Sequence, residues 1–160
     1  MPESVTPHHF PQVRWHGHWN WVEPVPPGDP IGWSTPEQPE ASGLFRKTFE
    51  LTEVPQLVPA RITADSRYVL FVNGNEVFRG PIRSQPRRMY YDLFDLAPYL
   101  QKGKNVIAVD VKFYGKAKTH WMPAVANGTL GKTGVMVFEA NVGDSWLVSD
   151  ASWRTQKNLA

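Results

Sequence analysis

The 160-residue chain contains no cysteine, which excludes a disulfide framework, a thiolate metal site and a cysteine nucleophile. It also lacks an excess of charge, because 17 basic and 15 acidic residues leave a formal net charge of +2. That balance argues against a binder of nucleic acid or of anionic membranes. No window approaches the roughly 18 apolar residues of a membrane span, and the first thirty residues lack the basic and apolar regions of a secretory signal. We therefore expect a cytoplasmic protein.

Long helical patterns are missing as well, and β-signals joined by short turns occupy residues 60–114, which predicts a sheet nucleus. Within it, Arg61 to Val72 reads as two short strands around a polar break at residues 65–67. Asn73-Gly74 between β-rich runs predicts a two-residue hairpin turn, since both central residues of a type I′ turn need φ above zero. Asn105 to Tyr114 is the clearest strand, and we expect burial on both of its faces for much of its length.

Further strands are predicted within this nucleus and on both sides of it, and together they give about eight strands with no internal repeat. Their positions are 44–51, 76–78, 89–96, 134–142, 145–148 and the surroundings of Trp153. With 41% hydrophobic residues the chain can bury a sizeable core in one domain. The pattern predicts an all-β, antiparallel sandwich.

Residues 1–42 form a lead-in rich in proline, tryptophan and histidine, ahead of the sandwich at 43–160. Its prolines and glycines oppose long regular structure, whereas four tryptophans (Trp15, Trp19, Trp21 and Trp33) are too many for a disordered tail. We expect an ordered coil packed on the sheets, with one short strand at residues 19–21. These tryptophans suit cover for the core, and they also suit a platform for stacking sugars.

The carboxylates do not form a hydrolytic pair. Glycoside hydrolysis generally needs two carboxyl groups about 5 to 10 Å apart, and the acids of the nucleus are Asp92, Asp95 and Asp110. Asp92 and Asp95 are three apart on a strand, so their side chains point to opposite faces. The motifs of serine hydrolases and of phosphate-binding loops are absent from the chain. We expect no catalysis from this chain alone.

The histidines offer a weak metal signal. His16 and His18 would share a face of an extended segment, and His8-His9 lie nearby. Two imidazoles fall short of the three or four ligands of a zinc site, so we predict no metal site.

Three stretches resemble a known family: "FRKTFEL", residues 62–115 from "ITADSRYVLFV" to "VKFYG", and "VSDASWRT". They are similar to the N-terminal β-sandwich of bacterial α-L-rhamnosidases and related multidomain glycoside hydrolases, over roughly residues 15–157. The resemblance implies a galactose-binding-like jelly roll and an accessory carbohydrate-binding or scaffolding role, with the chemistry in a separate catalytic domain of the same or a partner chain. Calcium occurs in some modules of this kind beside an Asp-Asn pair. Here Asp65-Ser66 stands in that place.

The leading hypothesis is a non-catalytic module that binds carbohydrate, with carbohydrate that contains L-rhamnose as one candidate. The alternative is a structural domain that docks a catalytic domain and has no ligand of its own. Sugar sites combine an aromatic face with planar polar groups, and a long loop at 115–133 and an arginine-rich loop at 80–88 are the best candidates to supply them. The predicted site residues are Trp121, His120, Asp65, Arg67, Arg83 and Tyr114. For Trp121, sugar contact and core packing are equally compatible with the sequence.

Overall fold

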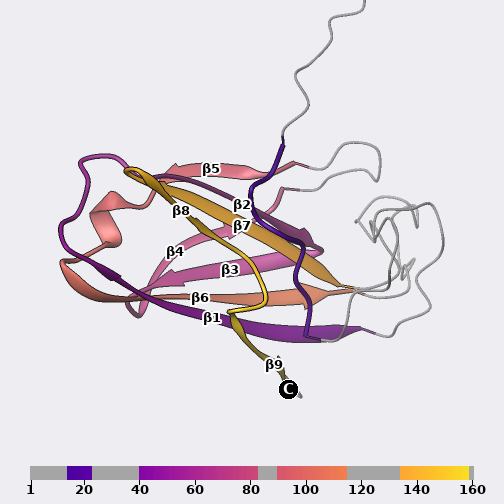
Figure 1. Cartoon of the computed structure of the whole chain (residues 1–160). Coiled ribbons are helices and arrows are strands. Elements are labelled where there is room, and N and C mark those ends of the chain that lie inside the picture. The colour runs from indigo at the N-terminus through magenta and orange to yellow at the C-terminus, as the bar shows by residue number, and fades with distance from the viewer. Residues whose placement is uncertain (1–13, 23–39, 83–89, 115–133, 159–160) are drawn as a thin grey trace, which may run out of the picture.

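The computed structural model describes residues 14–22, 40–82, 90–114 and 134–158, and these form two antiparallel β-sheets (Figure 1). The larger sheet has the strand order β4-β3-β6-β1-β9, and the smaller has the order β5-β2-β7-β8. The strands are β1 (Ala41–Leu51), β2 (Pro59–Asp65), β3 (Arg67–Val72), β4 (Asn75–Gly80), β5 (Asp92–Asp95), β6 (Gly103–Phe113), β7 (Val135–Val142), β8 (Ser145–Val148) and β9 (Arg154–Asn158). One 3₁₀ turn, η1 (Ala97–Tyr99), precedes β6.

This architecture confirms an all-β fold of two antiparallel sheets, consistent with a β-sandwich. Jelly-roll topology of the galactose-binding kind stays a prediction. The nucleus at 60–114 is divided between the sheets, because β2 and β5 lie in the smaller sheet and β3, β4 and β6 in the larger. No helix in the described part of the chain is long and apolar enough to cross a membrane.

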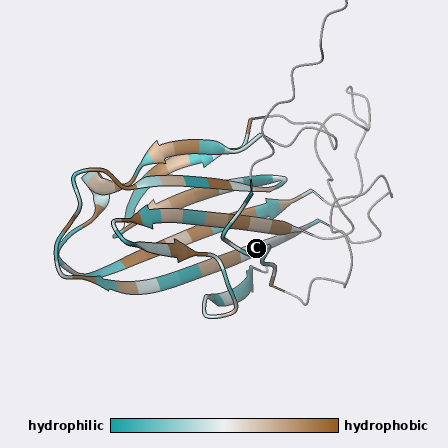
Figure 2. Cartoon of the chain, turned by 45° about the horizontal axis from the view of Figure 1, so that its top comes forward, coloured by the Kyte–Doolittle hydropathy of each residue, from teal (hydrophilic) through white to brown (hydrophobic). Residues whose placement is uncertain are grey.

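The core lies between the sheets and follows the period of two that strands impose. Ile62 on β2 and Phe138 on β7 meet Val109 on β6 and Leu70 on β3 in one buried cluster. Figure 2 shows hydrophobic and hydrophilic residues alternating along the strands. Each sheet therefore has one face in the core and one face turned outward.

Burial differs from the sequence-based expectation in one strand. The outward residues of β6, among them Val106 and Asp110, are only half-buried, so the prediction that this strand is covered on both faces is wrong. Instead β7 is buried from Val135 to Ala140. The physical reason is that residues 16–20 of the lead-in bond to β7 and to Ser149 beside it, whereas the outer face of β6 lies in an open sheet surface.

The Asn73-Gly74 hairpin turn is confirmed. Val72 and Asn75 pair across it, and the two turn residues have φ values of 51° and 85°. The Asn73 side chain adds a further tie, because its amide donates to Asn105 Oδ1 at 2.9 Å and its carbonyl oxygen accepts from the Val106 amide at 2.9 Å. The turn is thereby joined to the start of β6.

Residues 14–22 cross from the smaller sheet toward the larger one (Figure 1). The predicted short strand is reduced to a single bridge, in which Asn20 and Met136 exchange two backbone hydrogen bonds of 2.8 and 2.9 Å. Trp21 then enters the core, with its ring centroid 6.1 Å from those of Phe45 and Phe113. A Cβ on Gly134 would lie 2.4 Å from the Trp21 ring, so this glycine makes room for the tryptophan.

Candidate functional site

The chain passes from one sheet to the other at the polar break between β2 and β3. There the Ser66 amide donates to Lys112 O at 2.9 Å, and the Ser66 hydroxyl donates to Asp65 Oδ1 at 2.8 Å. The same hydroxyl oxygen accepts from the Tyr114 amide at 3.1 Å. The structure thus brings two predicted site residues, Asp65 and Tyr114, together around Ser66.

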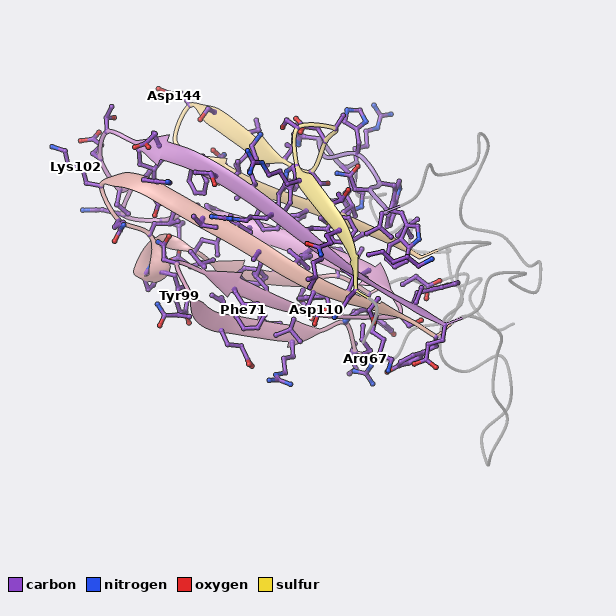
Figure 3. All side chains as sticks on the ribbon, turned by 90° about the horizontal axis from the view of Figure 1, so that it is seen from below. Arg67, Phe71, Tyr99, Lys102, Asp110 and Asp144 are labelled. Carbon is purple, nitrogen blue, oxygen red and sulfur yellow. The ribbon has the colours of Figure 1, made fainter. Side chains whose placement is uncertain are left out.

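Arg67, a third predicted site residue, is exposed at the same end of the sandwich. Its guanidinium donates to Pro81 O at 3.2 Å, so the beginning of the arginine-rich loop lies against the break at 65–67. In Figure 3, Arg67 lies at the opposite end of the molecule from Lys102 and Asp144. The backbone positions from which both predicted site loops depart, Ile82 and Tyr114, accordingly flank Arg67 and Ser66.

The remaining predicted site residues, Trp121, His120 and Arg83, lie outside the described residues and stay predictions. Asp65 itself is fully buried. Its carboxylate therefore accepts a hydrogen bond from Ser66 and does not face solvent.

The described residues around Asp65 supply no calcium ligand set. Calcium takes six to eight oxygen ligands, usually from several carboxylates and carbonyls. Across the described ranges, no group of three or more His, Asp and Glu side chains gathers. His16 and His18 do not converge on such a group either, since His16 faces Glu139 at 3.7 Å and the His18 backbone bonds to Ser149.

Two of the three nucleus carboxylates have structural partners. Asp92 Oδ2 accepts from the buried Tyr68 hydroxyl at 2.5 Å, directly beneath Gly80, where a Cβ would lie 2.1 Å from that oxygen. Asp95 Oδ1 accepts from the amides of Val58 at 2.8 Å and Ala97 at 2.9 Å, which holds the chain before β2 and the start of η1. Neither arrangement resembles an acid and a nucleophile facing one substrate.

Sequence reasoning missed a polar cluster on the outer face of the smaller sheet. Its centre is Glu139, fully buried on β7, which accepts two contacts from Arg61 of the neighbouring β2. The other carboxylate oxygen accepts from the amides of His16 at 2.6 Å and Gly17 at 3.1 Å. A buried charge needs such partners, so Glu139 fastens the lead-in to the sheet.

Aromatic rings surround this cluster. The Arg61 guanidinium lies 4.9 Å from the centre of the Trp15 ring, and Trp15 meets the edge of Tyr91 with centroids 5.7 Å apart. His16 stacks on the exposed Trp146 at 3.9 Å. A lone glutamate within the apolar run at 134–142 was the signal available in the sequence, because an unpaired acid there would be costly.

No family model matches the chain. In structure it is similar to a GH78 family rhamnosidase of Bacillus sp. GL1, with a TM-score of 0.67 and 32% identity over 91% of the chain. In sequence it is 26% identical to an α-L-rhamnosidase of Streptomyces avermitilis over 141 residues, or 86% of the chain. The chain matches a domain-sized segment of α-L-rhamnosidases.

This rhamnosidase-related domain spans only 14% of the Bacillus enzyme and 12% of the Streptomyces enzyme. It is also related to a fungal lectin from Pleurotus ostreatus, whose structure contains GalNAc, with a TM-score of 0.56 and 25% identity over 90% of the domain and 36% of the lectin. A Streptomyces avermitilis α-L-rhamnosidase in complex with L-rhamnose shares the fold, with a TM-score of 0.59 and 22% identity over 90% of the domain and 12% of the enzyme.

Proposed function

We propose that this chain is a non-catalytic carbohydrate-binding module of an α-L-rhamnosidase-like glycoside hydrolase, with galactose-binding-like jelly-roll topology. The observation that carries the proposal is the double relationship of one small domain to segments of rhamnosidases and to a lectin. A lectin binds sugar without hydrolysing it. The matched segment covers only 14% of the rhamnosidase, which is compatible with an accessory role in that enzyme.

We place the sugar site at the end of the sandwich where the chain crosses between the sheets. The exposed Arg67 offers planar donors for hydroxyl groups, and Tyr114 begins the segment that carries His120 and Trp121. A tryptophan face covers the apolar C–H patch of a sugar ring, and neighbouring polar groups set its orientation.

Asp65 contributes to this site indirectly. Its buried carboxylate orients the Ser66 hydroxyl, and that oxygen in turn holds the Tyr114 amide. Replacing Asp65 would therefore loosen the position of Tyr114, and we expect weaker sugar binding without loss of a direct contact.

Isothermal titration with L-rhamnose, GalNAc and a small panel of neutral monosaccharides tests the proposal. We expect heat of binding from at least one sugar in the wild type, and its loss in Trp121→Ala. Trp146→Ala is the matched control, because it removes an exposed tryptophan next to Asn141, at the end of β7 remote from Val135, the register partner of Asp65. No heat across the panel, or equal loss in both variants, would exclude a sugar site at this end.

A structural docking domain is the second candidate, and exposed apolar side chains favour it. Leu57 is 62% exposed and Leu93 is 69% exposed, both at the smaller sheet, where Tyr91 and Trp146 are also accessible. Such a surface suits contact with a catalytic domain of the same or a partner chain. If sugars give no heat while Leu93→Asp weakens association with the remainder of the parent enzyme, the docking role replaces the sugar-binding role.

A further inference from the structure

The outer face of the larger sheet carries a hollow that the proposed sugar site does not include. Its floor spans four neighbouring strands and encloses about 560 Å³. Leu44 and Ala108 supply apolar surface beside Phe71, while Asp110 and Gln156 supply polar groups. Figure 3 shows Phe71 between Tyr99 and Asp110, with Asp110 on the side toward Arg67.

A second hollow of about 390 Å³ adjoins the first and is cationic. The two share Arg46 and Arg154 as lining residues, and the second adds Lys47, Thr48, Lys104 and Ser152. Four of these six side chains are basic. No acidic side chain lines this second hollow within the described part of the chain.

Arg46 and Arg154 face each other directly across the β1–β9 pair, and both are exposed. Like charges in directly opposed positions destabilise a sheet. No carboxylate of the described residues lies within ion-pair distance of either guanidinium or of Lys104, although Glu50 is the register partner of Lys104. Lys47 differs, because its ammonium donates to Ser152, which is bonded to Asp150.

An anion between Arg46 and Arg154 would relieve this repulsion and accept forked hydrogen bonds from both guanidinium groups. Ala108 is the register partner of Arg46, and Phe71 is the register partner of Ala108, so this apolar surface lies one and two strands away from Arg46, at about 5 Å per strand. Aromatic and aliphatic contact next to paired arginines fits an acidic saccharide better than a bare inorganic ion, which needs no apolar floor. Nucleic acid fits less well, since a single half-buried Phe71 provides no series of stacking rings.

We infer that the outer face of the larger sheet binds an anionic oligosaccharide, with its acidic group between Arg46 and Arg154 and a sugar ring over Phe71. This site goes beyond the proposed function, because its lining residues differ from those of the sugar site and because it takes a charged ligand. The acidic group is a carboxylate of a uronate or a sulfate ester, which share the same recognition chemistry.

Titration calorimetry with four probes tests this inference: trigalacturonate, a sulfated disaccharide, neutral maltotriose and a short single-stranded DNA. We expect binding of trigalacturonate or the sulfated disaccharide but not of maltotriose, and the tighter of the two acidic probes identifies the acidic group. In the double variant Arg46→Gln with Arg154→Gln, we expect the Kd to rise about tenfold or more, because two charge-assisted contacts are lost.

The control is Arg14→Gln with Arg79→Gln, which removes the same charge from the lead-in and from the far edge strand β4. It should bind the acidic probe as the wild type does. The double variant Arg46→Gln with Arg154→Gln should have a melting temperature no lower than that of the wild type, since it removes a repulsive pair. Its heat of binding with L-rhamnose should be unchanged. Absence of binding by both acidic probes, equal weakening in both double variants, or equally tight binding of DNA would overturn the inference.

Discussion

Tyr68 is a buried side chain whose ionisation is coupled to the stability of the fold. Burial, and then the hydrogen bond to Asp92 and the charge of Asp92, raise the pKa of the Tyr68 phenol above its ordinary value. The folded protein therefore keeps the phenol protonated, whereas the unfolded chain releases the proton near its usual pKa of about 10. The stability contribution is fully present below that pH and is lost as the pH rises above it.

We expect the free energy of unfolding to fall above about pH 10 by up to about 1.4 kcal/mol per pH unit in the wild type. Tyr68→Phe should remove this slope and lower the stability at neutral pH by about 1 to 3 kcal/mol, because Asp92 loses its donor. Urea unfolding between neutral pH and pH 11 measures both effects. Tyr90→Phe, at an exposed tyrosine, is the control, and an equal change of slope in that variant would contradict the assignment.

Gly74 allows a second residue-scale prediction. Glycine adopts its φ of 85° without strain, whereas a β-branched residue is strained at this angle. Gly74→Val should destabilise the protein by about 1 kcal/mol or more, measured by thermal melting. Gly74→Asn is the matched control and should lose less, because asparagine tolerates this region; a Val variant that melts with the wild type would refute the turn geometry.

The contacts of some single residues could be predicted from the sequence, and those of others could not. The Asn73-Gly74 turn was predictable because its chemistry is local. Glu139 was not, because its partner Arg61 lies 78 positions away and its two amide donors lie in the lead-in. An acid in an apolar run indicates that a partner exists without indicating which one.

At the scale of elements, the period-two patterns placed most strands correctly, from β1 to β8. They did not assign strands to sheets, so the division of β2 and β3 between the two sheets was not predicted. That division depends on long-range pairing, such as β2 with β7 and β3 with β6. The lead-in at 1–42 was predicted to pack on the sandwich. Residues 14–22 contact the sheets through one bridge and one buried tryptophan, and for the rest of the lead-in the packing stays a prediction.

The lead-in yields a prediction about stability. Trp21 fills the core beside Phe45, so Trp21→Ala should destabilise the protein by about 3 to 5 kcal/mol. Trp146→Ala removes the same side chain from a surface where it is 45% exposed, and we expect a much smaller loss. Chemical denaturation of both variants tests this difference; similar losses would mean that Trp21 does not serve the core.

For the whole molecule, we predict that the purified chain hydrolyses no aryl α-L-rhamnoside. Asp92 and Asp95 are committed to Tyr68 and to backbone amides, and they point to different faces. A release assay with the chromogenic substrate measures the activity. Turnover that disappears in Asp92→Asn or Asp95→Asn would show that these carboxylates are catalytic.

The binding role is tested most directly by titrating ¹⁵N-labelled protein with L-rhamnose and with GalNAc and following every backbone amide by NMR. We expect saturable shifts of the Arg67 and Tyr114 amides with at least one of these sugars, while the amides of Trp146 on β8 and Arg154 on β9 stay unchanged. Spectra that remain unchanged throughout with both sugars, or shifts confined to the Trp15 and Trp146 surroundings, would contradict a sugar site at the end of the sandwich where Asp65 holds Ser66.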